Sequence, residues 1–241
     1  MNKKIRSLIC FALIVTISIS AVSMAFAGKP DKGPLEKKVF IHRAKPDNPV
    51  KPSKPDVKGK EWYKYSGIHW DSDDLSVTYT VDTYGSELDQ LDAFNIIVAS
   101  FETWDYETET EVFGLGSDTY DSHLTAGELD YVNAVVWGNY PTSGVIAVTY
   151  FWYYPSTGEL VDVDTMFDTD YTWSISDDGI AGTMDLQNIA THEFGHWLVL
   201  DDLYNRPAQT QTMYGYSTYG ETIKRTLESG DIAGLEAIYG E

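Results

Sequence analysis

Short stretches of the chain alternate between hydrophobic and polar residues with a period of two, the pattern typical of strands buried on one face. LSVTYTVD at residues 75–82 is the clearest. TETEVFG at 108–114 and YVNAVVW at 131–137 are shorter and contain β-branched or aromatic residues. Each of the three stretches predicts a strand.

Two longer apolar stretches lie at residues 144–154 and 158–167. The turn-favouring residues Pro155 to Gly158 join them. Such residues between two strand-like runs predict a β-hairpin. The whole pattern therefore predicts a sheet of about five strands.

Three other stretches show the spacing of helices. Residues 87–105 place apolar side chains on one helical face. A second helix is predicted from Asp185, a favourable N-cap residue, to Leu200, and a third over GDIAGLEAIYG at 230–240. A loop at 204–221 lies between them. The order of elements predicts an α+β fold, a mixed twisted sheet with three helices packed on it.

The N-terminal part divides into a signal and an arm. Residues 1–27 have a basic start, a long apolar run and a small-residue cleavage site, which predicts a secretory signal peptide. Left uncleaved, this run is long enough to tether the protein to the cell surface; after cleavage no stable membrane insertion is expected. Residues 28–60 are rich in lysine and proline and predict a flexible basic arm. The folded domain is expected over 61–241.

Charge and cysteine content narrow the possible functions. Residues 65–241 carry three basic and 32 acidic side chains, a net charge of −29, whereas 28–64 carry +6. So acidic a domain repels nucleic acid and favours cations or basic ligands. The only cysteine, Cys10, lies in the predicted signal, so no disulfide is expected. A monomer is expected.

The acidity has two interpretations. One is solubility outside the cell. The other is calcium binding, for which carboxylates are suitable ligands. The candidate calcium ligands are Asp162, Asp164, Asp168 and Asp170.

The strongest chemical signal is HEFGHWLVLDD at residues 192–202. In a helix, His192 and His196 lie one above the other on one face and can bind one metal ion. Glu193 lies one position round the helix, where it suits a general base for a metal-activated water. A catalytic zinc ion needs a third protein ligand and an open position. Asp202 suits that role, with the adjacent Asp201 as a competitor.

The segment HEFGHWLVLDD resembles the long zinc motif of the metzincin peptidases, HExxHxxGxxH/D. Carried over by position, Asp202 is the third zinc ligand; aspartate occupies this place in some prokaryotic members. QTMYGY then resembles the methionine turn of the family, with Met213 as a packing support beneath the metal. The C-terminal RTLESGDIAGLEAIYG resembles the closing helix of the matrixin branch, and SGVIAVTYFW resembles its edge strand.

The resemblance implies a secreted zinc endopeptidase that cleaves protein or peptide substrates. Zinc on His192, His196 and Asp202 would polarise the scissile carbonyl, and Glu193 would take the proton from water and pass it to the leaving amine. The substrate would lie extended along the edge strand. The residues expected there are Ile146, Ala147, Val148 and Thr149.

The chain departs from the family pattern at three places. The family glycine at the turn after the helix is Val199, and because valine resists positive φ the turn is expected to be made differently. Val148 and Met166 stand where histidines of a structural zinc would be expected, so no second zinc is expected. The latency segment with its zinc-blocking cysteine is missing.

The basic arm raises a further hypothesis. Its positive charge could place it across the acidic domain, where it would occlude the cleft until it is cut, with His42 near the zinc. The alternative is a flexible spacer. His69 and His123 are interpreted as surface or core residues.

Three rival functions remain open. A different class of zinc peptidase would use Glu221 or Glu228 as its third ligand. A non-catalytic metal-containing module would use the acidic cleft to bind a basic partner. A calcium-dependent surface protein would keep the HExxH helix as a relic.

Overall fold

The computed structural model describes residues 32–45, 62–120 and 123–240. Nine strands are found in these ranges: β1 (Glu36–Ala44), β2 (Val77–Asp82), β3 (Phe113–Thr119), β4 (Ala134–Gly138), β5 (Val145–Tyr153), β6 (Leu160–Asp168), β7 (Trp173–Ser174), β8 (Met184–Asp185) and β9 (Tyr216–Ser217). The helices are α1 (Gln90–Asp105), α2 (Leu186–Trp197) and α3 (Ser229–Tyr239), with 3-10 turns η1 (Arg206–Ala208) and η2 (Ile223–Arg225).

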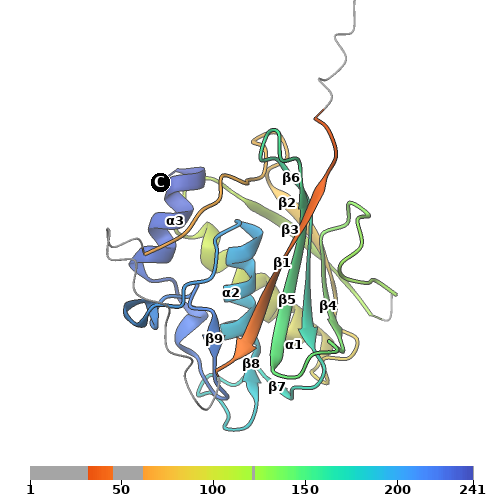
Figure 1. Ribbon diagram of the computed structural model, residues 1–241. Helices are drawn as coiled ribbons and strands as arrows, with labels where there is room; N and C mark the ends of the chain where they lie inside the picture. The colour runs from red at the N-terminus through yellow and green to blue at the C-terminus, as the bar shows by residue number, and fades with distance from the viewer. Residues whose placement is uncertain (1–31, 46–61, 121–122, 241) are drawn as a thin grey trace, which may run out of the picture. The chain divides into compact units, whose positions relative to one another are not determined.

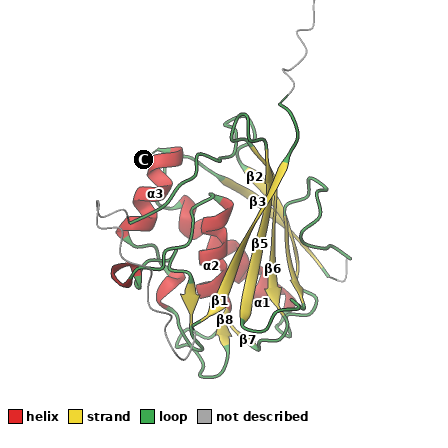
Figure 2. Cartoon of the chain, viewed as in Figure 1, coloured by secondary structure: helices red, strands yellow, loops and turns green. Residues whose placement is uncertain are grey.

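Seven strands form one mixed sheet in the order β3-β2-β4-β6-β5-β1-β9, and β7 and β8 form a separate pair. The strands β3, β2, β4 and β6 are parallel neighbours, β5 is antiparallel to β6, and β1 is antiparallel to β5 and parallel to β9. Figure 2 shows the helices gathered on one face of this sheet. The predicted α+β class, with a mixed sheet and three helices, is confirmed.

The core lies between the sheet and the helices α1 and α2. Phe101 of α1 stacks on Phe194 of α2, with ring centroids 3.5 Å apart. The indole of Trp104 donates to the carbonyl oxygen of Thr191 at 2.8 Å. Burying large aromatic side chains in this way is the main stabilising term for a domain without disulfides. The two helices are therefore fixed against each other, and α2 has a defined position beneath the sheet.

The element boundaries mostly follow the sequence pattern, with two shifts. The strand expected at 108–114 begins only at Phe113, because the Asp105 carboxylate at the end of α1 accepts the N–H groups of Val112 and Phe113 and so fixes the preceding loop. The helix predicted to reach Leu200 ends at Trp197, and Asp185 caps its first turn as predicted, accepting from the N–H of Asn188.

The largest difference concerns the basic arm. Residues 36–44, which composition assigned to a flexible segment, form β1 between β5 and β9 (Figure 1). The flexible interpretation was wrong for these residues because β1 is held by pairing with a distant strand, which local composition does not reveal. By its contacts, Lys32–Glu241 forms one unit, so the unit begins earlier than Glu61. The predicted signal at 1–27 lies outside the described residues.

Among the described residues, no helix has both the length and the apolar character needed to cross a bilayer.

The acidic residues proposed for calcium make hydrogen bonds within the protein. Asp162 accepts from the N–H groups of Asp130 and Tyr131, and Asp164 accepts from those of Gly127 and Ala134. These two side chains of β6 therefore hold the segment that leads into β4. In the part of the chain that the structure describes, they belong to no cluster of three metal-ligating side chains. Calcium binding stays a prediction.

Asp168 and Asp170 are likewise engaged. The Asp168 carboxylate accepts from the N–H of Asp170 at 2.9 Å, and the Asp170 carboxylate accepts from the Asn139 amide at the same distance. The first bond lies within the turn that follows β6, and the second joins that turn to the segment that follows β4.

Burial raises the pKa of Asp164 to about 7 and that of Asp162 to about 6. Since the folded pKa lies above the unfolded value of about 3.9, the native state binds more protons between these values, and stability should fall as pH rises from about 4 to about 7. Asp164→Asn removes one such group. We expect this variant to gain stability relative to the unchanged protein as pH rises from about 4 to about 7, measured as thermal midpoints.

Asp73→Asn, on the exposed loop before β2, is the matched control. A difference between Asp164→Asn and the unchanged protein that is constant with pH would contradict the prediction. Repeating the series with added Ca²⁺ tests calcium binding, which would raise the midpoint of the unchanged protein but not that of Asp164→Asn.

Candidate active site

Helix α2 carries the two histidines of the HExxH motif. His192 and His196 are fully buried, and their ring centroids lie 4.9 Å apart with the planes at 86°. Arg225 of η2 forms an ion pair with the N-cap residue Asp185, which fixes the start of the helix. The motif therefore projects both imidazoles from a rigid, covered helix, as its four-residue spacing predicts.

Backbone carbonyls fix the tautomer of each imidazole. Nδ1 of His192 donates to the carbonyl oxygen of Thr212 at 2.6 Å, and Nδ1 of His196 donates to that of Leu200 at 2.7 Å. A carbonyl oxygen only accepts, so each Nδ1 carries the proton. Burial lowers the pKa of His192 to about 4, which keeps this ring neutral near neutral pH. In the neutral form of each ring, Nε2 then presents a lone pair, as a metal ligand requires.

Asp202 brings a third acceptor to the same point. Its Oδ1 lies 3.3 Å from Nε2 of His192 and 3.6 Å from Nε2 of His196. Its other oxygen accepts from the hydroxyl of Tyr204 at 2.8 Å. All three facing atoms are buried and have no hydrogen-bond partner among the described residues. Three converging acceptors without a donor suit a cation, and two imidazoles and a carboxylate suit zinc.

The competing carboxylates are engaged elsewhere. Glu221 contacts Ser217 and Thr218, and Glu228 is the N-cap of α3. Within the described residues neither carboxylate joins a potential metal cluster, and the same holds for Asp201. The group formed by His192, His196 and Asp202 is therefore the one that the geometry favours.

The turn after α2 corrects one expectation. Val199 has φ = +57°, the left-handed conformation that the sequence analysis expected valine to avoid. Its N–H bonds to the carbonyl of His196, and the N–H of Leu200 bonds to that of Gly195. The chain thus makes the same sharp turn with valine that glycine would allow more easily. The buried side chain of Val199 packs in the core, which offsets the backbone strain.

The segment around Met213 packs against α2. A Cβ placed on Gly195 would collide with the sulfur of Met213, so these residues are in close contact. The buried carboxylate of Asp231, from α3, accepts from the N–H groups of Thr212 and Met213 at 2.8 and 3.0 Å. Since Thr212 also orients His192, α3 helps to fix the metal-facing ring.

Glu193 is buried beside the metal-facing atoms and is oriented by a chain of donors. The Trp197 indole donates to the Thr165 hydroxyl (2.8 Å), which donates to Thr149 (2.7 Å), whose hydroxyl donates to Oε2 of Glu193 (2.7 Å). Burial raises the pKa of Glu193 to about 7. A carboxyl group with a pKa near neutrality suits proton transfer in both directions.

The predicted substrate edge is occupied by β1. In the antiparallel register, Ala147 pairs with His42, Val148 with Ile41, and Thr149 with Phe40; Ile146, also fully buried, lies at a register shift. Val148 pairs on its other side with Met166 of β6. The residues expected to form a free edge therefore lie inside the sheet.

Phe40 and His42 of β1 reach the motif itself. The Phe40 ring stacks on His196 with centroids 3.9 Å apart and planes at 7°, and the His42 ring lies 3.9 Å from that of His192. Nδ1 of His42 lies 2.9 Å from Oε1 of Glu193. His42, His192 and Glu193 form a second cluster that could hold a metal ion.

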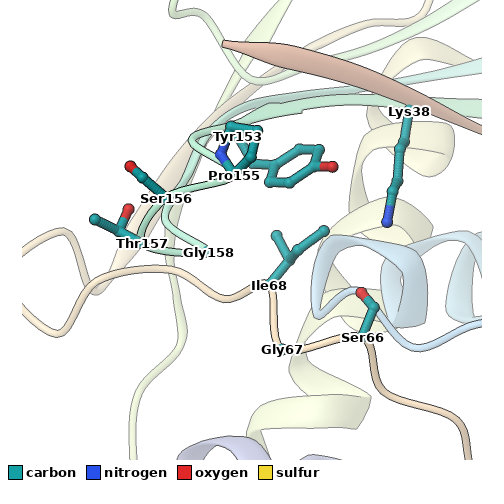
Figure 3. A pocket seen from close by; sticks show the side chains of 9 residues that line it. All are labelled: Lys38, Ser66, Gly67, Ile68, Tyr153, Pro155, Ser156, Thr157 and Gly158. Carbon is teal, nitrogen blue, oxygen red and sulfur yellow. The ribbon is translucent and has the colours of Figure 1, made fainter. Parts of the chain in front are cut away.

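A separate cavity of about 400 Å³ lies beside the N-terminal half of β1 (Figure 3). It is lined by Lys38 of β1, Tyr153 of β5, the turn from Pro155 to Gly158 and the segment from Ser66 to Ile68. It contains none of the metal-facing residues.

Sequence reasoning missed four contributors to the site. Phe40 lay in the presumed arm, and Tyr204 and Thr165 gave no motif signal. Asp231 carried one weak signal, since it stands three residues after Glu228 at the start of α3, the spacing of a reciprocal helix cap.

The family model described as Matrixin matches residues 69–240. The hatching enzyme of Paracentrotus lividus is 29% identical over 181 residues, which cover 73% of this chain and 27% of the relative. Human matrix metalloproteinase-25 is 26% identical over 91% of this chain and 39% of its own length. Human neutrophil collagenase is 26% identical over 68% and 32%. The chain thus spans between about a quarter and two fifths of these relatives.

Substitutions at Val199 test the strained turn. Within a helix or strand, a protein with alanine is normally more stable than the same protein with glycine by about 0.5–1 kcal/mol. At a left-handed position the order reverses, because a Cβ costs about 1–2 kcal/mol there. Both Val199→Ala and Val199→Gly lose core packing. We expect Val199→Gly to be the more stable of the two by about 1 kcal/mol in denaturant unfolding; the opposite order would show that the turn relaxes out of the left-handed region.

Proposed function

Because the chain belongs to the matrixin family of peptidases, we propose that it is a secreted zinc-dependent endopeptidase that cleaves protein or peptide substrates. One observation carries the proposal: three buried acceptor atoms, from His192, His196 and Asp202, converge without a donor among the described residues, with Glu193 beside them. The signal predicted at residues 1–27 supports secretion. The named relatives are a matrix metalloproteinase, a collagenase and a hatching enzyme, which supports a protein substrate.

The metal would be held by Nε2 of both histidines and by Oδ1 of Asp202, with one position open for water. When bound, Zn²⁺ supplies Lewis-acid polarisation of the scissile carbonyl and lowers the pKa of its water toward neutrality. Thr212, Leu200 and Tyr204 orient these ligands through the bonds described above. This arrangement supports Asp202 as the third ligand in preference to Asp201.

Glu193 serves as the general base and then as the general acid. Its Oε1 faces the site, while Oε2 is held by Thr149. With β1 displaced, Oε1 accepts a proton from the attacking water and then donates it to the leaving amine. The substrate chain lies extended along Ile146–Thr149, where strand pairing fixes the scissile bond above α2.

Zinc content tests the ligand assignment. Asp202→Ala should lose zinc on dialysis against a weak chelator, while Asp201→Ala should retain about one zinc per chain, because only the former removes an atom of the converging group. The measurement is metal analysis by mass spectrometry, with circular dichroism to check folding. Retention of zinc by Asp202→Ala would instead support a glutamate such as Glu221 or Glu228 as ligand.

Activity tests the role of Glu193. Glu193→Gln keeps the size of the side chain and should retain zinc, but should lower kcat/KM on an unfolded protein substrate by about 10²–10⁴-fold, the usual contribution of a general base. Because His42 contacts Glu193, the comparison is also made in a chain carrying Phe40→Ala and His42→Ala. Cleavage should stop with a chelator and return with zinc.

If zinc is bound but neither chain cleaves the substrate, the endopeptidase proposal fails. The non-catalytic binding module then becomes the better account of the same site.

A further inference from the structure

The strand β1 occupies a groove that an extended peptide would otherwise fill. It pairs with β5 over eight positions, from Glu36 opposite Tyr153 to Arg43 opposite Val145. On its other side, Arg43 and Ala44 pair in parallel with Tyr216 and Ser217 of β9. Without β1, both β5 and β9 would present unpaired N–H and C=O groups, which is the usual template for adding a peptide strand. Figure 1 shows β1 lying along β5, beside α2.

Alternate residues of β1 face the helix. Side chains two apart lie on the same side of a strand, so Lys38, Phe40 and His42 share one face. Phe40 covers the imidazole of His196 and also stacks on Phe151 of β5, at 5.4 Å. Val39 and Arg43, at the intervening positions, are exposed. The face that meets the site is therefore the one with aromatic and imidazole side chains.

His42 makes the most specific contacts. It is the one fully buried residue of β1. While Nδ1 contacts Oε1 of Glu193, Nε2 lies 3.1 Å from the hydroxyl of Ser217 and 3.5 Å from the ammonium of Lys224. An imidazole that donates at Nδ1 accepts at Nε2, and both Ser217 and Lys224 are donors. The ring is thus satisfied on both sides while it occupies the carboxylate oxygen that proton transfer needs.

We infer that β1 is a peptide ligand carried by the chain itself, which fills the groove between β5 and β9 and blocks Glu193 through His42. The consequence of this inference, that the peptidase is latent, rests on the proposed function. The groove recognises an extended peptide with an aromatic side chain and, two residues later, a side chain that both donates to Glu193 and accepts from Ser217 and Lys224. The occupant in this protein is residues 36–44.

Connectivity explains how the block is released. Residues 46–61 join β1 to the rest of the domain, so one cut there leaves β1 held by non-covalent contacts alone. An intramolecular ligand competes at an effective concentration of roughly millimolar, and this advantage disappears once the link is cut. The freed strand then dissociates on dilution and the groove opens to substrate.

The test compares three forms of the full chain: unchanged, Phe40→Ala/His42→Ala, and the matched control Val39→Ala/Arg43→Ala, which truncates exposed residues of the same strand. Two readouts are used, cleavage of a fluorogenic peptide and binding of a fluorescein-labelled synthetic peptide with the sequence of residues 35–45. Circular dichroism and zinc content check that each form is folded and loaded.

We expect Phe40→Ala/His42→Ala to cleave at least tenfold faster than the unchanged chain, and the control to change less than twofold. The labelled peptide should bind the Phe40→Ala/His42→Ala chain and inhibit it, and should not bind the unchanged chain. If the unchanged chain cleaves as fast as Phe40→Ala/His42→Ala, the inference is overturned while the proposed function stands.

The remaining outcomes separate the two ideas further. If no form cleaves but the peptide binds only the Phe40→Ala/His42→Ala chain, the inference that β1 fills this groove is supported and the peptidase proposal fails. If the peptide binds all forms equally, or none, β1 is not a ligand of this groove.

Discussion

The convergence of three buried acceptor atoms is the constraint on which the rest of the site depends. The Oδ1 atom of Asp202 lies 3.3 and 3.6 Å from the Nε2 atoms of His192 and His196, and all three atoms lie within 4.8 Å of one another. Lone pairs so close together are unfavourable unless a cation lies between them. The protein must therefore hold the rings against this repulsion in the absence of metal, and two short bonds to backbone carbonyls, those of Thr212 and Leu200, do so.

Those two carbonyls connect the site to the rest of the fold. The Leu200 carbonyl is in place because the chain turns at Val199 with positive φ. The Thr212 carbonyl is in place because Asp231, on α3, accepts two successive backbone N–H groups at Thr212 and Met213. The C-terminal helix thus contributes none of the three facing atoms and still fixes the orientation of the His192 ring, in the way that outer partners orient metal-binding side chains generally.

The sequence predicted those parts of the molecule in which local pattern decides structure. The four-residue spacing placed both histidines, the N-cap Asp185 marked the start of α2, and turn residues marked the β5–β6 hairpin. Local reasoning was wrong at Val199, where packing of a buried side chain outweighs a backbone preference of about 1–2 kcal/mol.

Local reasoning also could not find β1. Its nine residues include three lysine or arginine side chains before or after His42 and lie in a proline-rich setting, so composition indicates an arm. The strand forms through pairing with β5, more than a hundred residues away, and its hydrogen bonds use backbone groups that every sequence possesses. The hypothesis that the arm occludes the cleft came from charge, whereas the contacts that hold it come from strand pairing and two rings.

The unequal burial of β1 and β5 explains how such a strand can be both specific and removable. Eight of the nine residues of β5 are buried, whereas His42 alone is buried in β1. The core therefore depends little on β1, whose attachment comes from backbone pairing, the Phe40 stack and the bonds of His42. These are the same kinds of contact that an extended substrate would make in this groove if the proposed function holds. Substitutions in the groove that strengthen substrate binding should also strengthen the binding of β1. Under the proposed latency, substrate specificity and inhibition by β1 therefore depend on the same surface.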